Sequence, residues 1–195
     1  MTMLPANSEG GRKLIHLGSS VIPLGYWIAG RDAAIVILFF LTIAIIGIEI
    51  ARIYTTWGRR TYQRFLGSVT RPSEGHRPTG ATYVFIGAFL AAILFAPVVA
   101  ILSMLFMSVG DTAAAFIGQR YGRIPIGGKS LEGTLACFLA CLLLTLPTEL
   151  TLPVTVGGAA VAALTELVPK PFLNDNLAIP VFSGAAMTLL MVAGL

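Results

Sequence analysis

One carboxylate stands at the end of a long uncharged stretch of the chain. Asp111 follows the uncharged residues 80–110, and Thr112 and several small side chains lie beside it. A carboxylate with a neighbouring hydroxyl and little steric crowding suits a divalent metal ion that carries phosphate oxygens. An ion pair between Asp111 and Arg120, or another loop cation, is the structural alternative and requires no ligand.

A basic, glycine-rich segment follows at residues 120–132 and could bind a polyanion. Its cations, its flexible backbone and a hydroxyl at the start of the next helix would serve as donors to a triphosphate. The residues concerned are Arg120, Arg123, Gly128, Lys129 and Ser130. The segment is not a Walker A loop, because an extra glycine precedes the lysine and a membrane helix, not a strand, precedes the loop. A basic loop without a ligand is the alternative.

Further polar residues lie near the ends of the predicted helices. Arg12, Lys13 and His16 fall within about one helical turn, so they could bind a phosphate together, or His16 could accept a proton from a hydroxyl. The other candidates are Glu49, Arg52, Glu74, Glu132, Asp175 and Asn176. Each also has a structural explanation, as a residue at a helix start, an i,i+3 ion pair or a helix cap.

The elements that must position these residues are apolar. Of 195 residues, 56% are hydrophobic and 11% are charged, whereas soluble domains carry roughly 25% charged residues. We therefore expect an all-α, polytopic membrane protein with about seven transmembrane helices. These helices are expected near residues 14–29, 33–52, 80–95, 97–119, 133–150, 153–168 and 177–194. Cys137 and Cys141, one turn apart in an apolar stretch, are expected to be small packing residues.

The distribution of charge predicts how the helices cross the membrane. With seven spans, every basic residue except Arg31 falls on the side of the N-terminus, which is the positive-inside pattern. The N-terminus is therefore expected in the cytoplasm and the C-terminus outside. Most of the acids, Glu166 among them, lie on or near the cytoplasmic side as well. We interpret residues 1–195 as a single integral-membrane catalytic domain, with a cytoplasmic amphipathic connection at 53–79 that lies on anionic lipid headgroups.

Several motifs together resemble a known family of membrane enzymes. Residues 109–118 read Val-Gly-Asp-Thr-Ala-Ala-Ala-Phe-Ile-Gly, and Gly122 and the sequence Lys-Ser-Leu-Glu-Gly at 129–133 follow. This combination resembles the polyprenol and diacylglycerol kinase family, which includes dolichol kinase, phytol kinase and the CTP-dependent diacylglycerol kinase. The Arg12-Lys13-x-x-His16 start, the approach at 74–80 to a Thr-Gly-Ala-Thr-Tyr helix, and residues 175–180 agree with that family.

The resemblance implies a CTP-dependent kinase that transfers the γ-phosphoryl group of CTP to the hydroxyl of a membrane lipid alcohol. The reaction would take place at the cytoplasmic face of the cell (inner) membrane. Mg²⁺ or another divalent cation would be held by Asp111, with Glu132 or Asp175 as a second acidic ligand. The candidate catalytic residues are Asp111, Lys129, Glu132 and His16. The candidate nucleotide-binding residues are Arg120, Arg123, Gly128, Lys129, Ser130 and Thr112. The candidate substrate-binding or phosphate-binding residues are Arg12, Lys13, Glu49, Arg52, Glu74, Asp175 and Asn176.

Two other functions are alternatives. CDP-diacylglycerol synthase shares the Gly-Asp-Thr element, but its usual Lys-Asp pair and Gly-rich Asp-Arg-x-Asp ending are missing here, so a CDP-lipid-forming cytidylyltransferase ranks second. A small ion-coupled transporter would place ionisable residues near the midplane and show an inverted repeat, and the sequence has neither. The expected partners are the lipid alcohol, CTP and anionic lipid headgroups, with no nucleic acid, and a homo-oligomer is left open. No residue distinguishes a polyprenol, phytol or diacylglycerol as the acceptor.

Overall fold

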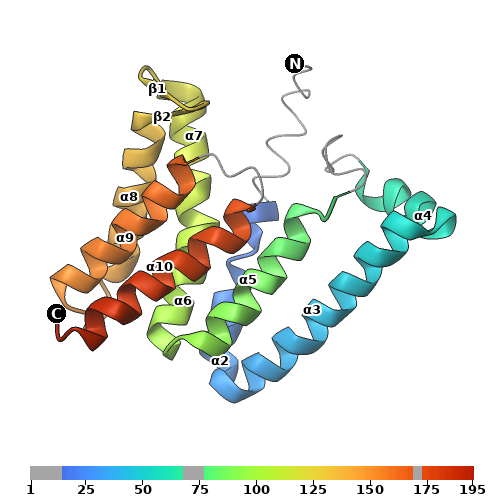
Figure 1. Ribbon diagram of the computed structural model, residues 1–195, viewed down its shortest axis with the longest axis horizontal. Coiled ribbons are helices and arrows are strands. Elements are labelled where there is room, and N and C mark those ends of the chain that lie inside the picture. Colours follow the sequence, from blue (N-terminus) through green and yellow to red (C-terminus); the bar gives the residue numbers. More distant parts are fainter. Residues whose placement is uncertain (1–14, 68–76, 169–172) are drawn as a thin grey trace.

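The computed structural model describes residues 15–67, 77–168 and 173–195, which fold almost entirely into helices (Figure 1). The α-helices are α2 (Val21–Ala29), α3 (Arg31–Tyr54), α4 (Thr56–Leu66), α5 (Gly80–Leu94), α6 (Pro97–Leu105), α7 (Asp111–Tyr121), α8 (Leu131–Thr145), α9 (Leu152–Leu167) and α10 (Asp175–Val192). A π-helical segment, η2 (Phe106–Gly110), joins α6 to α7 in one continuous helix. Strands β1 (Pro125–Ile126) and β2 (Lys129–Ser130) form a short hairpin. The all-α fold class is therefore confirmed for the described residues.

Three helices are long and apolar enough to cross a membrane, judged by length and composition. They are α3, the continuous helix Pro97–Tyr121 and α10, and α5, α8 and α9 are shorter apolar helices. These elements indicate an integral membrane protein, while the seven spans and their orientation stay predictions. Each predicted segment contains a helix. The first one is interrupted, because a turn at Ser19 and Ser20 precedes the start of α2 at Val21.

Local sequence explains where several helices begin. Gly30 has a φ of 79°, in the left-handed region that favours glycine, so α3 can begin one residue after α2 ends. Pro97 is the first residue of α6, where its missing N–H costs nothing. Thr55 ends α3 in an extended conformation and accepts a hydrogen bond from the Gly58 amide, which caps α4.

Small residues line the contacts between the helices. Gly133 on α8 lies so close to α7 that a Cβ there would be 2.7 Å from the Ala114 carbonyl oxygen and 3.2 Å from the Gly118 Cα. Gly87 on α5 meets α10 in the same way, with an added Cβ 2.7 Å from the Asn176 carbonyl oxygen. Such close approaches stabilise helix packing inside a membrane, where the lipid tails remove the hydrophobic driving force between helices.

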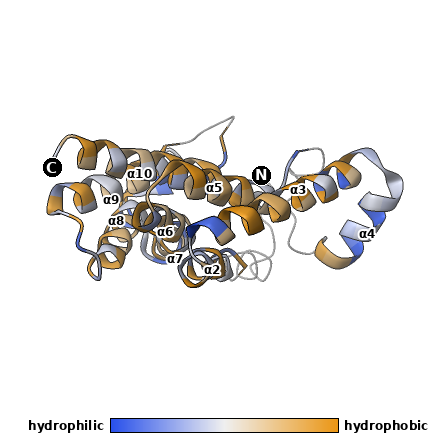
Figure 2. Ribbon diagram, turned by 90° about the horizontal axis from the view of Figure 1, so that it is seen from below, coloured by the Kyte–Doolittle hydropathy of each residue, from blue (hydrophilic) through white to orange (hydrophobic). Residues whose placement is uncertain are grey.

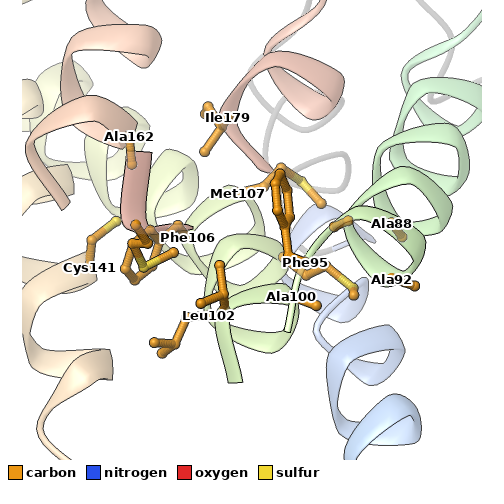
Figure 3. Packing of buried hydrophobic residues seen from close by; sticks show 14 of the residues in the cluster. Ala88, Ala92, Phe95, Ala100, Leu102, Phe106, Met107, Cys141, Ala162 and Ile179 are labelled. Atoms are coloured by element: carbon orange, nitrogen blue, oxygen red, sulfur yellow. The ribbon is translucent and has the colours of Figure 1, made fainter. Parts of the chain in front are cut away.

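The two cysteines are packing residues, as predicted. Cys137 and Cys141 are free and fully buried. They lie against Gly110, where an added Cβ would be 2.6 Å from the Cys141 Sγ. Figure 3 shows Cys141 beside Phe106, in the core that α6 and η2 form with the neighbouring helices.

Most residues of the bundle helices are apolar (Figure 2), and many large apolar side chains are exposed. On α3, large side chains such as Ile37, Phe40 and Ile43 are exposed, as expected for a helix that faces lipid. The exception is α4, which carries three arginines and packs mainly against α3. In both ribbon views α4 lies at the end of α3, away from α8 and α9.

Candidate active site at the polar end of the bundle

A π-helical segment leads directly into Asp111. η2 widens the continuous helix just before this carboxylate, and such π-bulges recur at functional sites. Residues near the N-terminal end of the described chain form hydrogen bonds with this segment. The Met107 carbonyl oxygen accepts a hydrogen bond from His16 Nε2 at 3.0 Å, and the Ser20 and Ser108 hydroxyls share a hydrogen bond of 2.8 Å. The sequence predicted one uninterrupted helix over residues 97–119, and η2 was not anticipated.

His16 and Asp111, both singled out by sequence, contact each other. His16 Nε2 lies 3.2 Å from Asp111 Oδ2 and also donates to the Met107 carbonyl oxygen. Because both partners are hydrogen-bond acceptors, Nε2 must carry a proton. In the neutral ring, Nδ1 is then the nitrogen with a free lone pair. The His16 side chain is 14% exposed and that of Asp111 is 23% exposed, so the pair is accessible at the edge of the bundle.

A tight hairpin positions Lys129. Gly127 and Gly128 form its two-residue loop, and both have positive φ (55° and 88°), as a type I′ hairpin turn requires. This geometry explains the additional glycine that breaks the Walker A spacing. Lys129 Nζ then reaches the Glu166 carboxylate at 2.8 Å and the Asp175 carboxylate at 3.0 Å, and it also donates to the Glu166 carbonyl oxygen.

The two acids keep Lys129 charged. Burial lowers the pKa of the Lys129 ammonium, but the hydrogen bond that Lys129 donates to Glu166 and the negative charges of Asp175 and Glu166 raise it by more. The net result is a pKa above the ordinary value for lysine. Lys129 is therefore a permanent cation at neutral pH, and it cannot serve as a proton acceptor there.

Glu166 is a functional candidate that was not among the site residues predicted from the sequence. The residue is 5% exposed, and within the described part of the chain its Oε2 is buried without a hydrogen-bond partner. It interacts electrostatically with Asp111 and Asp175 as well as with Lys129. Its position near the end of an apolar helix was the available signal, but a cap or helix-end role explained that position equally well.

These groups come from distant parts of the sequence and meet at one end of the bundle. Figure 1 shows the hairpin, the end of α9 and the start of α10 at the same, upper end. Asp111 begins α7, which packs against η2, α8 and α9. The rest of the bundle is largely apolar (Figure 2). The arrangement can hold anionic groups through Lys129 and can move a proton through His16.

Other motif residues have structural roles. The Ser130 hydroxyl is buried and accepts a hydrogen bond from the Gly133 amide at 3.1 Å, which caps α8. A Cβ on Gly118 would lie 3.0 Å from that same hydroxyl. Thr112 donates to the Ser108 carbonyl oxygen at 2.6 Å, inside its own helix. The small residues of the motif thus let α7 and α8 approach each other around Ser130.

Several predicted site residues lie apart from this group of contacts. Glu132 accepts a hydrogen bond from the Ile124 amide at 3.3 Å, and the Arg120 guanidinium lies 5.6 Å from the ring of Tyr121. Arg123 is exposed. Within the described ranges, no group of three or more His, Cys, Asp or Glu side chains is arranged to hold a metal ion.

Glu49 and Arg52 form a buried network between α3, α4 and α5. Arg52 donates to Glu49 through Nε at 2.7 Å and to the Arg77 carbonyl oxygen at 2.6 Å. The other carboxylate oxygen of Glu49 accepts hydrogen bonds from the Thr79 hydroxyl at 2.9 Å and the Thr82 hydroxyl at 2.8 Å. With Glu49 6% exposed and Arg52 5% exposed, this geometry favours a structural role over phosphate binding.

Asn176 links that region to the start of α10. Its Nδ2 donates to the Gly80 carbonyl oxygen at 2.8 Å, and it stands next to Asp175, which contacts Lys129. The start of α5 is thus tied to the polar end of the bundle. The predicted phosphate-binding residues Arg12, Lys13 and Glu74 lie outside the described residues.

Comparisons with known proteins find relatives over most of the chain. An uncharacterized protein of Rickettsia prowazekii, RP860, is 26% identical over 182 residues, which cover 88% of this chain and 89% of that protein. The CTP-dependent diacylglycerol kinase 1 of Schizosaccharomyces pombe is 28% identical and covers 68% of this chain and 69% of its own. The phytol kinase of Synechocystis is 31% identical, and the matched residues cover 74% of this chain and 60% of that protein. No family model matches, and no solved structure matches.

Proposed function

Because the chain is a distant homologue of the family that contains CTP-dependent diacylglycerol kinase, phytol kinase and dolichol kinase, we propose that it is a CTP-dependent lipid kinase. It transfers the γ-phosphoryl group of CTP to the hydroxyl of a membrane lipid alcohol. The acceptor class comprises polyprenol-like and phytol-like alcohols and diacylglycerol. All 195 residues act as one integral-membrane catalytic domain, with the reaction at the cytoplasmic face.

The observation that carries this proposal is the meeting of His16, Asp111, Lys129, Glu166 and Asp175 at one end of an apolar bundle. Ionisable groups are costly in such surroundings, so they mark a functional site by default. Their position at a helix end suits a lipid whose tail lies in the bilayer and whose hydroxyl reaches the interface. The positive-inside pattern supports a cytoplasmic location for this end.

His16 is proposed as the general base. Its Nε2 proton is committed to Asp111 and the Met107 carbonyl oxygen, so Nδ1 is the atom that accepts the proton of the lipid hydroxyl. The alcohol oxygen forms a bond to the γ-phosphorus as the bond between that phosphorus and the bridging oxygen breaks. CDP leaves, and the Asp111 carboxylate stabilises the imidazolium that forms.

Lys129 is proposed to neutralise the phosphates, because phosphoryl transfer depends mainly on positioning and charge. Its raised pKa keeps it cationic. The remaining charge would come from Arg120 and Arg123, in the nucleotide-binding loop at residues 120–132, and from Arg12 and Lys13. Ser130 and Gly128 would act by holding the hairpin and α8 in place.

A divalent cation such as Mg²⁺ fits the residues of this site in part. The buried Glu166 Oε2 without a hydrogen-bond partner, in electrostatic contact with Asp111 and Asp175, offers unused ligand capacity. Mg²⁺ is usually held by one or two carboxylates together with substrate phosphates, so one or two of Asp111, Asp175 and Glu166 would hold it when nucleotide is bound. The metal would neutralise charge on the phosphates. Glu132 fits less well, because its carboxylate already accepts hydrogen bonds from Ile124.

The test follows radioactive label from CTP into lipid with purified protein, Mg²⁺ and a panel of polyprenols, phytol and diacylglycerol. Label from γ-labelled CTP in a lipid phosphate is expected, and addition of a chelator should abolish it. Label from α-labelled CTP in a CDP-lipid, made from phosphatidic acid with release of pyrophosphate, would instead make the protein a cytidylyltransferase. Transfer of neither label, by protein that remains folded, would contradict the proposal.

A pair of matched variants connects that assay to the site. Asp111 and Asp32 are both acids in the first turn of a helix, α7 and α3 respectively, but Asp32 lies near Gly30, outside the group of residues described above. Asp111→Asn is expected to lower turnover at least about 100-fold, because it removes the carboxylate that orients His16. Asp32→Asn is expected to leave turnover within about twofold of the parent. Equal activity in the two variants would remove Asp111 from the site.

A further inference from the structure

Helix α4 (Thr56–Leu66) is the one amphipathic, strongly basic helix in the part of the chain that the structure describes. A single residue, Thr55, separates α4 from the end of α3. The 24 residues of α3 give it a length of about 36 Å, which is more than the roughly 30 Å hydrocarbon core of a bilayer. If α3 crosses the membrane, α4 must therefore lie at the level of the lipid headgroups. This inference rests on the α3–α4 geometry alone and not on the proposed kinase activity.

The turn between α3 and α4 sets which face of α4 points toward the membrane. Gly58 is buried against α3, and an added Cβ there would lie 2.6 Å from the Ala51 carbonyl carbon and 2.8 Å from the Thr55 hydroxyl. The Arg52 guanidinium lies 5.2 Å from the ring of Tyr62. The face that contains Gly58 and Tyr62 is thus held against the end of α3, the side on which the hydrocarbon lies.

That same face carries apolar side chains that are exposed in the described structure. At about 100° per residue, Phe65 and Leu66 lie on the Gly58 side of the helix and Trp57 lies at its margin. Phe65 is 74% exposed and Trp57 is 73% exposed. A tryptophan at the boundary of an amphipathic helix is typical of the membrane interface.

The charges of α4 suit an anionic surface. Arg60 and Arg64 are exposed on the side of the helix away from Gly58, and residues 50–67 contain no acid. We propose that α4 is an interfacial helix that docks onto the anionic phospholipid headgroups of the bilayer that α3 crosses. Trp57, Phe65 and Leu66 insert at the level of the headgroups, and Arg60 and Arg64 pair with lipid phosphates.

The chain contains two tryptophans, which makes the proposal directly testable in the full-length protein. In Trp27→Phe, Trp57 is the sole indole, and the variant is reconstituted into nanodiscs of phosphatidylcholine alone or with phosphatidylglycerol. Anionic lipid is expected to shift the Trp57 emission to shorter wavelength and to protect it from acrylamide. Lipids brominated near the headgroup should quench it. Trp57→Phe, which keeps Trp27 on α2, should show no dependence on headgroup charge.

Variants of the polar face separate charge from apolar insertion. In the Trp27→Phe background, Arg60→Ala and Arg64→Ala are each expected to lower the ratio of docked to undocked α4 about fivefold, since each arginine contributes attraction at the anionic surface. Arg60→Lys should restore the parent behaviour, and Gln63→Ala, on the same face but neutral, should change nothing. Trp57 emission that is equally accessible to acrylamide in both lipids would overturn the proposal. So would protection that appears in detergent without anionic lipid, because a protein contact would then cover the helix.

Discussion

Replacing Glu49 by glutamine tests whether the α3–α5 network is structural. Glu49→Gln keeps the size of the side chain but removes the negative charge that faces Arg52. Arg52 is 5% exposed, so its guanidinium would remain buried without a compensating carboxylate. The Thr79 and Thr82 hydroxyls would also lose a charged acceptor.

The expected magnitude follows from this burial. Breaking a buried ion pair by removing one partner costs about 3–5 kcal/mol. For a chain of this size, each kcal/mol shifts Tm by about 2–4 °C, so Glu49→Gln is expected to lower Tm by about 6–20 °C. The assay is thermal unfolding in detergent, followed by circular dichroism at two heating rates, because irreversible unfolding would make the apparent Tm depend on the rate.

Asp32→Asn is the matched control. Asp32 is an exposed acid at the start of the same helix, α3, so its loss should cost less than about 1 kcal/mol. If Glu49→Gln instead unfolds within about 2 °C of the parent and loses CTP turnover, Glu49 binds ligand and the structural interpretation of the network is wrong. A large loss of stability in both variants would show that the destabilisation does not come from the buried pair.

Three further predictions concern packing, thiols and pH. Gly133→Ala should lower stability by about 1–3 kcal/mol, because the added methyl meets the Ala114 carbonyl oxygen. Gly47→Ala is the control and should not lower stability, because there is open space around Gly47. Thermal unfolding compares the two variants. A water-soluble maleimide should modify the buried Cys137 and Cys141 only after denaturation, and mass spectrometry before and after unfolding checks this. The pKa of Lys129 is raised, so this side chain holds its proton more tightly in the folded protein than in the unfolded chain. The stability lost in Lys129→Met should therefore be constant from about pH 6 to 9 and should shrink only as pH rises through the raised pKa. Unfolding measured from about pH 6 to above about pH 11 would show both parts.

The positions of the helices were predictable because the chain alternates long apolar runs with short polar segments. The continuous helix from Pro97 and the last helix lie within a few residues of their expected ends. The first helix was harder, because it is broken at Ser19 and Ser20, and Ser20 there contacts Ser108, which lies far along the chain. The hairpin at Lys129 was also missed, since its two-residue glycine turn looks in the sequence like a flexible loop.

The sequence singled out some residues of the candidate site, but it omitted Glu166 and could not show which residues contact each other. Asp111, His16 and Lys129 could be singled out because charged or titratable groups are expensive near membrane helices. Sequence alone cannot show that His16 meets Asp111, since the contact depends on how the N-terminal segment docks on η2. The sequence also placed Glu49 among the ligand-binding candidates. In the structure, the Glu49 carboxylate accepts hydrogen bonds from Arg52, Thr79 and Thr82.

At the polar end of the bundle, the charge of Lys129 does not balance the charges of Asp111, Glu166 and Asp175. Glu166 and Asp175 contact the Lys129 ammonium, and Asp111 interacts electrostatically with Glu166. If all are ionised, these four side chains carry a net negative charge and would repel a nucleotide triphosphate. The proposed kinase activity would therefore need further positive charge at this site. The basic loop at residues 120–132, Arg12 and Lys13, and a bound divalent cation would each supply part of that charge.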